Sequence, residues 1–523
     1  MAIEMPGSPL PDHAMSYWVD STDQPSYPRL TDAIEADVAV VGGGIAGIST
    51  AAFLAEAGRD VALLEADEVL RGTTGHTTAK VTVGHGLRYQ YLIDTFGERT
   101  ARLYAEANRT ALEAVTRRVR REGIDCEFTP AAAYAYALSE DRREAIQREV
   151  DAARRLGLAA SYVEDVPAPV DAAAAVRYAD QAHFHPREYL LALLETFERE
   201  GGRVYEHSRV TGIETGSPHV LRTRDGRVGA DDVVVASHFP FYRRSLYTKR
   251  MLPHQEHVLA ADVEGEPPED MYVSVGPDTH SFRPVPTGEG PMLLVDGYRH
   301  PTGIGEDTMA LTRQIESWTT ETFPVEAVTY RWTVQDYETL DRVPYVGSID
   351  PFADGVYVAT GFGGWGVTHG TVAGLLLRDL ILGRENAWAE LYDPNRLPTA
   401  ALKGLPGAGR TMLKQRAKGK RSLSGGERAP DLRPGEGQVV NLHGRTLGLY
   451  REDVDTWRAV EGTCPYGGCT LVWNGAGESW DCPCDGSRFT VDGSVVDGPA
   501  QEGLGRVPLA VTRRDERVAR EAR

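Results

Sequence analysis

The stretch DVAVVGGGIAGISTAAFLAEAGRDVALLE, residues 37–65, decides the fold of the first part of this chain. An apolar run typical of a buried strand leads into Gly42, Gly44 and Gly47, and a helical pattern and a second apolar run follow. In such a unit the first glycine permits a tight turn, the second lets a pyrophosphate approach, and the third allows close helix–strand packing. Glu65 ends the second strand, where a carboxylate can bind ribose hydroxyls. The stretch therefore predicts a dinucleotide-binding βαβ unit.

Length and charge narrow the class of protein. The chain has 523 residues, enough for two or three domains, and a formal net charge of −20, which argues against nucleic acid as its main partner. The beginning of the chain lacks the basic and apolar runs of a signal peptide. The most apolar late stretch, residues 372–382, is interrupted by Arg378 and Asp379 and is too short to span a bilayer. We expect a cytoplasmic protein with no membrane span.

The rest of the first 397 residues alternates between helical and extended patterns. Amphipathic helices are predicted over 97–122, 139–156 and 185–202. Alternating segments dominate 245–335 and predict a separate antiparallel sheet. A strand at 355–360 then leads into a glycine-rich turn and a helix. Together these patterns predict an α/β (α+β) protein whose Rossmann-like domain is joined to an antiparallel-sheet domain.

Residues 464–488, CPYGGCTLVWNGAGESWDCPCDGSR, hold four of the five cysteines, and the fifth, Cys126, reads as a buried small apolar residue. The two cysteine-rich loops have the spacing of a Rieske domain, whose cluster needs two thiolates on one iron and two imidazoles on the other. The thiolates would be Cys464 and Cys482. The imidazole positions hold Tyr466 and Asp485.

This block resembles the C-terminal domain of bacterial and archaeal FAD-dependent oxidoreductases that carry a Rieske module, and the likeness extends over 433–509. The resemblance implies a small all-β domain and a disulfide between Cys469 and Cys484. Three interpretations of the altered site stay open. The domain could hold no metal. A [2Fe–2S] cluster could survive on Tyr466 and Asp485 or on a rearranged set of four cysteines. The four cysteines could instead bind zinc.

Most of residues 16–397 resembles the family of D-amino-acid, sarcosine and glycine oxidases, through RGTTGHTTAKVT, DYETLDRVPYVG and ATGFGGWGVTHGT. The resemblance implies FAD as cofactor. It implies that a loop after the ribose carboxylate wraps the flavin and that a glycine turn packs against the isoalloxazine. Besides the first three glycines and Glu65, the predicted flavin-binding residues are Thr73, Thr74, His76, Thr77, Val210, Gly361, Gly363, Gly364 and Gly366. For His76, covalent attachment to FAD and a hydrogen bond within the loop are both open.

The catalytic candidates are Lys80, His85, Arg283 and Trp365. Arg283, like Arg299 in the segment DGYRH, could hold a substrate carboxylate through two parallel hydrogen bonds. The family resemblance implies hydride transfer to flavin, with the protein supplying orientation and electrostatics.

These features predict an FAD-dependent oxidoreductase that acts on a C–N bond of a small amine or amino acid, with an unknown electron acceptor. The alternatives are electron transfer from FAD to a residual cluster or cysteine pair, and a non-catalytic flavin-binding scaffold. The predicted domains are the oxidoreductase (1–397), a basic linker (398–432) and the Rieske-like domain (433–523). Within the oxidoreductase, residues 30–96, 150–240 and 336–397 are assigned to FAD binding, and 97–149 and 241–335 to substrate binding.

Overall fold

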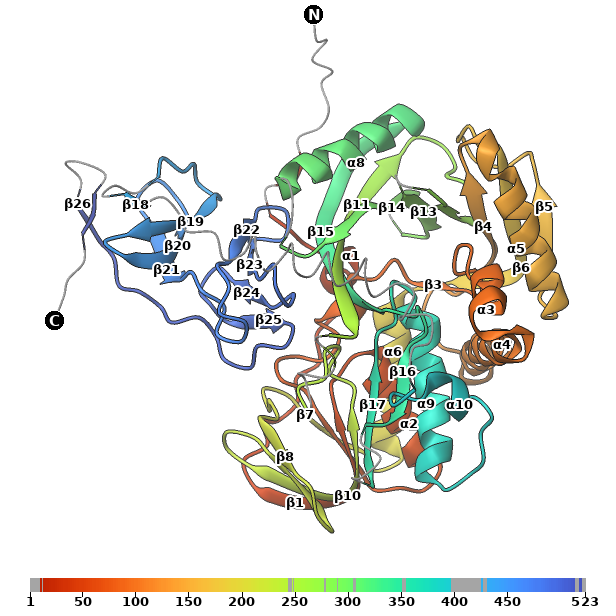
Figure 1. Cartoon of the computed structure of the whole chain (residues 1–523), viewed down its shortest axis with the longest axis horizontal. Helices are drawn as coiled ribbons and strands as arrows, with labels where there is room; N and C mark the ends of the chain where they lie inside the picture. Colours follow the sequence, from red (N-terminus) through yellow and green to blue (C-terminus); the bar gives the residue numbers. More distant parts are fainter. Residues whose placement is uncertain are drawn as a thin grey trace, which may run out of the picture.

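The computed structural model describes residues 10–11, 13–242, 247, 249–276, 279–288, 290–303, 307–349, 354–396, 425–426, 430–512 and 517–519. The chain forms two halves built on large sheets, with a smaller all-β domain at their side (Figure 1). Of the predicted basic linker, residues 398–424 and 427–429 lie outside the described residues.

The first half is a mostly parallel sheet with the order β16-β17-β10-β1-β2-β7. Its central strand β1 (Ala33–Val41) pairs in parallel with β10 (Arg227–Val235) and β2 (Val61–Leu64). Helix α2 (Ile45–Glu56) follows β1, which confirms the predicted βαβ unit. The other strands are β7 (Arg203–Tyr205), β8 (Gly212–Glu214), β9 (His219–Arg222), β16 (Tyr345–Ser348) and β17 (Val356–Thr360). The central strands β1, β2 and β10 contain continuous buried apolar runs, because a parallel sheet is covered on both faces.

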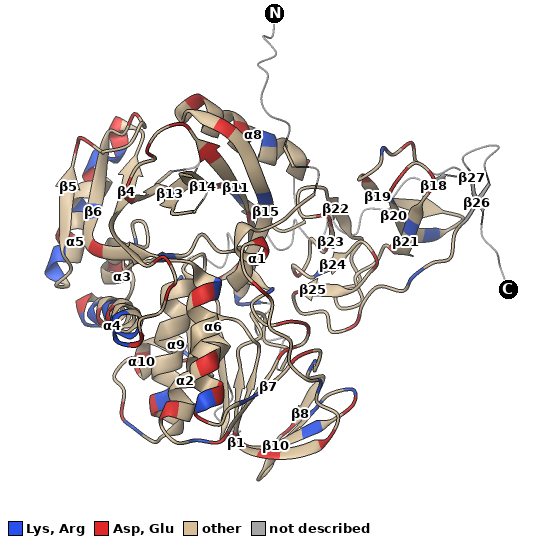
Figure 2. Ribbon diagram, turned by 180° about the vertical axis from the view of Figure 1, so that it is seen from behind, with Lys and Arg blue, Asp and Glu red and all other residues tan. Residues whose placement is uncertain are grey.

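Helices α2, α6 (Pro186–Arg199) and α9 (Gly366–Ile381) lie together on one face of this sheet (Figure 2). Helix α4 (Glu98–Glu122) packs against α9, and Gly123 ends it in the left-handed conformation with φ of 63°. Basic and acidic side chains are interspersed along α4, as in the Arg102–Glu98 pair at 2.7 Å, so its exposed face is mixed in charge (Figure 2). The remaining helices are α1 (Tyr17–Asp20), η1 (Thr73–His76), α3 (Tyr89–Phe96), η2 (Glu140–Arg142), α5 (Arg143–Arg155) and α10 (Ala389–Tyr392).

The second half is a nine-stranded sheet with the order β15-β11-β14-β13-β12-β4-β6-β3, and β5 pairs with β6. Helix α8 (Thr308–Thr322) packs on β11 and β14. The strands are β3 (Lys80–Val81), β4 (Thr129–Ala137), β5 (Ala160–Val163), β6 (Ala174–His183), β11 (Met251–Val263), β12 (Met271–Ser274), β13 (His280–Val285), β14 (Met292–Pro301) and β15 (Val325–Thr339). The predicted antiparallel sheet is therefore present.

One part of the predicted division needs correction. Strands β3, β5 and β6 fall in segments assigned to FAD binding, yet they belong to the second sheet. The reason is pairing, because β6 runs antiparallel to β4 from Ala137↔Ala174 to Thr129↔His183, and β3 and β5 both pair with β6. Such long-range pairing leaves no local mark in the sequence.

The C-terminal domain contains two small sheets and a terminal hairpin. The first sheet comprises β18 (Gly425–Gly426), β19 (Gly437–Leu442), β20 (Arg445–Arg451) and β21 (Trp457–Glu461). The second comprises β22 (Val472–Asn474), β23 (Ser479–Asp481), β24 (Arg488–Thr490) and β25 (Val495–Asp497), and the hairpin is β26 (Ala510–Thr512) with β27 (Arg517–Ala519). Its core is built around Trp480 and Phe489. The disulfide that the resemblance implied joins Cys469 to Cys484.

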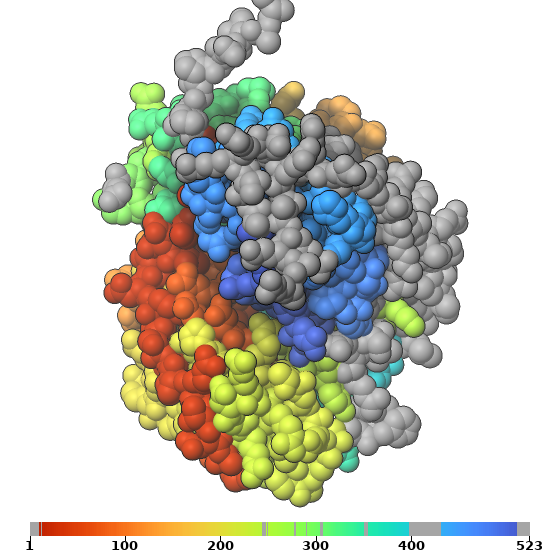
Figure 3. Space-filling model, turned by 90° about the vertical axis from the view of Figure 1, so that its left-hand side faces the viewer, coloured from red at the N-terminus to blue at the C-terminus, as the bar shows by residue number. Residues whose placement is uncertain are grey.

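This domain is docked on the oxidoreductase rather than separate from it. It covers the middle of the face shown in Figure 3, with N-terminal residues beside it and the β8 region below. Gln255 of β11 donates to the Asp481 carboxylate at 2.7 Å, and Arg331 of β15 donates to the Ala476 carbonyl oxygen at 3.1 Å. Both contacts are buried, so the interface is specific and polar. Across the ranges described above, no helix is long and apolar enough to cross a membrane.

Candidate active site

The turn between β1 and α2 forms a cradle in which Gly42 and Gly47 leave no room for a side chain. Gly42 has a φ of 115°, and a Cβ there would lie 2.4 Å from the Ala236 carbonyl oxygen. A Cβ on Gly47 would lie 1.9 Å from the Gly42 carbonyl oxygen, so this residue must also lack a side chain. Gly44 precedes the first turn of α2, whose N–H groups face the turn. The backbone therefore has the shape that a pyrophosphate group requires.

Glu65 follows β2 beside this turn. Its Oε2 accepts a hydrogen bond from the Gly43 N–H at 2.6 Å, and Oε1 accepts one from the Asp67 N–H at 3.0 Å. Burial raises the pKa of Glu65. Thr74 lies on the other side of the turn, where its Oγ1 accepts from the Ile45 N–H at 3.0 Å. Glu65 and Thr74 thus flank the predicted dinucleotide cradle.

The predicted flavin loop forms η1 and contacts β15. The Thr73 hydroxyl donates to the Gln335 carbonyl oxygen at 3.0 Å, and the Trp332 indole donates to the His76 carbonyl oxygen at 2.8 Å. His76 Nδ1 lies 2.9 Å from the Gly72 carbonyl oxygen, a hydrogen bond within the loop. The Thr77 carbonyl oxygen accepts from the Trp18 indole at 2.6 Å. The loop is therefore fixed against the second sheet.

Val210 lies apart from this loop. It is buried in the apolar cluster that also contains Val41 and Leu64 of the parallel sheet. Its side chain therefore packs in the apolar core of the parallel sheet.

The second predicted glycine turn joins β17 to α9. Gly361, Gly363 and Gly364 all have positive φ, and Gly366 is the first residue of α9. A Cβ on Gly361 would lie 2.5 Å from Thr339 Cγ2, so β15 packs directly on this turn. The Gly364 N–H donates to Asp336 Oδ2 at 2.5 Å. This turn and the η1 loop therefore both contact strand β15, and the turn belongs to the parallel-sheet half of the molecule.

Two of the predicted catalytic residues, His85 and Trp365, lie together. Their rings stack with centroids 4.6 Å apart. His85 is buried, and its Nε2 donates to the Thr82 carbonyl oxygen at 2.9 Å while Nδ1 lies 2.7 Å from the Tyr104 hydroxyl. Burial holds the pKa of His85 well below its usual value, so the imidazole is neutral. Both ring nitrogens of His85 make hydrogen bonds, so the imidazole is held in place and its ring supports Trp365 by stacking.

Arg283 does not lie as its predicted role requires. It is 1% exposed, and its guanidinium donates to the carbonyl oxygens of Thr78 at 2.6 Å, Pro284 at 2.8 Å and Phe184 at 3.3 Å. The same group lies over the Trp18 ring at 5.2 Å. Most of its donors are used by backbone, so Arg283 stabilises the sheet instead of presenting a fork to a carboxylate.

Lys80 lies at a charged cluster on the second sheet. Its Nζ is within hydrogen-bond reach of Ser281 and lies 3.5 Å from Asp296 Oδ1. Ser281 and Asp296 are directly opposite each other in neighbouring strands, so they share one face of the sheet. Burial lowers the pKa of Lys80, and Asp296 opposes that shift.

The charged cluster continues along the same sheet with Arg299, a predicted carboxylate-binding candidate, and with Glu256, Glu338 and Arg88, which were not predicted. Arg299 lies 3.7 Å from Glu256 and 3.4 Å from Glu338, and Glu338 lies 3.4 Å from Arg88. Burial raises the pKa of Glu256 to about 7. The Arg299 and Arg88 guanidinium groups outweigh burial and lower the pKa of Glu338. Since Glu338 forms a bridge with Phe362 in the glycine turn, the cluster lies beside the predicted flavin site.

His238 connects three parts of the chain at the edge of this site. Its Nδ1 lies 3.0 Å from Asp497 of the C-terminal domain, and its Nε2 lies 3.2 Å from Asp336 of β15. The two carboxylates raise the pKa of His238 to about 10 against the effect of burial. Asp336 also binds the Gly364 N–H, so the C-terminal domain is linked through charge to the predicted flavin turn.

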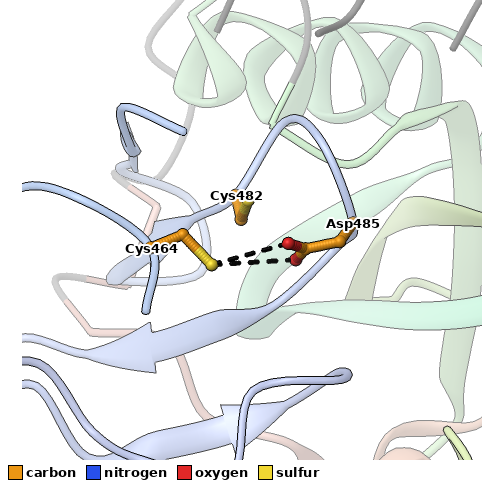
Figure 4. Close-up of side chains that lie close together, drawn as sticks. All are labelled: Cys464, Cys482 and Asp485. Carbon is orange, nitrogen blue, oxygen red and sulfur yellow. Dashed lines mark hydrogen bonds between the residues drawn. The ribbon is translucent and has the colours of Figure 1, made fainter. Parts of the chain in front are cut away.

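In the C-terminal domain, Cys464, Cys482 and Asp485 converge (Figure 4). All three are buried, and their ligand atoms lie within 4.8 Å of one another. Asp485 Oδ2 lies 3.5 Å from Cys464 Sγ. Tyr466 is half-buried and packs against the same core.

This donor set does not fit a Rieske cluster. Such a cluster needs imidazoles on its second iron, and the chain has Tyr466 and Asp485 at those positions. The disulfide removes Cys469 and Cys484 as thiolates, so the interpretations that used four cysteines, for a cluster or for zinc, do not fit this structure. Two thiols and one carboxylate are what the site offers.

Comparison with known proteins identifies both parts of the chain. Residues 37–380 match the family described as FAD dependent oxidoreductase, and residues 427–508 match the Rieske [2Fe-2S] domain. A Bacillus subtilis (strain 168) protein, YhfW, described as a Rieske 2Fe-2S iron-sulfur protein, is 36% identical over 501 residues, which cover 94% of this chain and 97% of that protein.

Two further similarities concern the first part alone. Gamma-glutamylputrescine oxidoreductase of Escherichia coli (strain K12) is 28% identical over 408 residues, 73% of this chain and 93% of that enzyme. The crystal structure of glycine oxidase from Geobacillus kaustophilus superposes with a TM-score of 0.56 and 20% identity, covering 70% of this chain and all of that one. The glycine oxidase likeness is one of fold.

Proposed function

The chain belongs to the FAD-dependent oxidoreductases and ends in a Rieske domain, and on that premise we propose that it oxidises a C–N bond of a small amine or amino acid. The single observation that carries the proposal is the charged cluster of Lys80, Asp296, Glu256, Arg299 and Glu338 beside the flavin loops. Similarity to gamma-glutamylputrescine oxidoreductase supports an amine as the substrate.

The residues fit FAD. Gly42, Gly44 and Gly47 would hold the pyrophosphate, and Glu65 the ribose hydroxyls. When bound, FAD supplies an acceptor for the two electrons of a hydride. The N-terminus of α9, beginning at Gly366, would stabilise negative charge on the flavin ring.

The charged cluster would bind and prepare the substrate. Asp296 and Glu256 offer carboxylates to a substrate ammonium, and Lys80 and Arg299 offer cations to a carboxylate. With its raised pKa, Glu256 would accept a proton from the substrate nitrogen, which leaves the amine neutral. Oxidation of the neutral amine would remove a hydride from the carbon beside the nitrogen, and bound FAD would supply the acceptor. The resulting iminium ion would react with water to give a carbonyl compound and ammonia or a smaller amine.

A panel of amines and amino acids, mixed anaerobically with the full-length flavoprotein, tests this proposal. We expect at least one of them to bleach the flavin band. NADH and NADPH serve as controls for a reductase activity. Rapid bleaching by NADPH, with none by any amine, would reject the proposal in favour of a reductase.

Electron transfer from FAD to a residual cluster or cysteine pair in the C-terminal domain is the alternative function, and the match to the Rieske domain supports it. The absence of both imidazoles from the donor set argues against a cluster with two histidine ligands.

A further inference from the structure

The arrangement of Cys464, Cys482 and Asp485 matches one ion better than two. For a tetrahedral ion with metal–sulfur distances of about 2.3 Å and metal–oxygen distances of about 2.0–2.2 Å, a sulfur and an oxygen ligand lie about 3.5 Å apart. Cys464 Sγ and Asp485 Oδ2 are 3.5 Å apart. In a Rieske cluster the thiolates and the other two ligands bind different irons. We propose that these three residues bind a single thiophilic divalent cation, with zinc as the reference ion.

The charge of the site supports a cation. Asp485 is 5% exposed, and its oxygens are met by the Ser487 N–H at 2.8 Å and the Cys464 thiol. Arg488 lies close in sequence, but it binds Asp481 and Ser479. None of the ion pairs within the described ranges involves Asp485. A buried carboxylate needs a compensating charge, which a divalent ion bound with two thiolates supplies.

The two loops are built to keep these ligands close. The Cys469–Cys484 disulfide ties the loops together with a Cα–Cα distance of 6.4 Å. A Cβ on Gly467 would lie 2.5 Å from Asp485 Oδ2, so the carboxylate occupies space that only glycine leaves open. Three protein ligands leave a fourth position for water or for Tyr466, which belongs to the same loop.

The ion would also fix the docking of the domain. The second loop continues from Asp485 to Gly486, whose carbonyl oxygen accepts from Gln335 Nε2 at 2.9 Å. Pro483 packs against Gly303 of the oxidoreductase, because a Cβ added to Gly303 would lie 2.8 Å from the Pro483 nitrogen. Closing the loop around an ion therefore orders the segment that contacts the oxidoreductase.

Metal analysis of the full-length flavoprotein, purified after growth with zinc and iron, tests the proposal. We expect about one zinc per FAD. Cobalt exchanged into the site should give the visible bands of a tetrahedral thiolate complex, at wavelengths beyond the oxidised flavin. Cys464→Ser and Asp485→Asn should each weaken metal binding by at least about tenfold, because loss of even a residue that supports a ligand costs about 10–100-fold. Cys126→Ala removes a buried thiol far from the site and should leave the metal content unchanged.

A second readout does not depend on the variants folding. Chelation of the wild-type protein should make two thiols, Cys464 and Cys482, newly reactive to alkylation. Two irons per chain with acid-labile sulfide would overturn the proposal. So would a metal-free protein in which the two thiols react equally with and without chelator, or one in which Cys464 and Cys482 form a disulfide.

Discussion

Gln335 and Gly486 join the two functional parts of the molecule: the side-chain amide of Gln335 donates to the Gly486 carbonyl oxygen at 2.9 Å. The backbone carbonyl of Gln335 accepts from Thr73 in the predicted flavin loop. Gly486 follows Asp485 in the second cysteine-rich loop. A single residue of β15 therefore contacts both the flavin loop and the altered Rieske loop.

The docking of the C-terminal domain depends on the absence of a side chain at Gly486. A Cβ there would lie 2.5 Å from Pro253 Cβ. Gly486→Ala should lower the free energy of unfolding by about 1–3 kcal/mol beyond the backbone strain, because the interface must shift. Thermal unfolding and limited proteolysis measure the effect. Gly435→Ala is the matched control, since Gly435 has a similar φ of 83° and open space around it. Equal effects of the two variants would contradict a tight interface.

The His238 pair should make stability depend on pH. The folded pKa of His238, about 10, lies above the unfolded value of about 6.5, so its contribution is full below about pH 6.5 and is lost as pH rises through about 10. His238→Gln should therefore lower the melting temperature most below about pH 6. Its effect should be smallest near pH 10, where the wild-type histidine also loses its charge. His13→Gln, at a side chain that is 82% exposed, is the control. A pH-independent effect of His238→Gln would exclude the charged link.

Glu65 should decide how firmly FAD is held. Glu65→Ala removes the carboxylate beside Gly43 and should weaken FAD binding by about tenfold or more, the loss of a charge-assisted hydrogen bond of about 1.5–3 kcal/mol. Released flavin after gel filtration provides the measurement. Glu68→Ala, a nearby carboxylate paired with Arg71, is the control. Full FAD occupancy in Glu65→Ala would count against the ribose assignment.

Glu256 should set the pH dependence of flavin reduction. Its carboxyl is protonated below its pKa of about 7, so the rate of reduction by an amine should rise with pH through that value. Glu256→Gln should flatten this rise and slow reduction by about 10²–10⁴-fold. Glu264→Gln, outside the cluster, should keep the wild-type profile. An unchanged profile in Glu256→Gln would assign the proton transfer to another group.

The sequence could predict the dinucleotide unit because its evidence is local. The spacing of Gly42, Gly44 and Gly47 and the carboxylate of Glu65 all lie in one segment, and the structure places them at one turn. The disulfide between Cys469 and Cys484 was predicted from the family resemblance, which is also carried by one segment of the chain. The position of β6 could not be predicted, because its pairing with β4 is long-range.

Only Lys80 and Arg299 of the charged cluster were predicted, and the rest was missed for a related reason. Glu256, Arg299 and Glu338 come from three strands far apart in the chain, and only the strand register brings them together. The segment DGYRH (296–300) led to the prediction for Arg299, and a similar segment, HQEH (254–257), was the available signal for Glu256. The surroundings of Arg283 could not be predicted, because the sequence does not show that backbone carbonyl oxygens surround its guanidinium group.

The most direct test of C–N bond oxidation is a single anaerobic turnover with an amine that bleaches the flavin. We expect about one equivalent of carbonyl product, with matching ammonia or smaller amine, for each FAD reduced. Flavin reduction without cleavage of the C–N bond would contradict it.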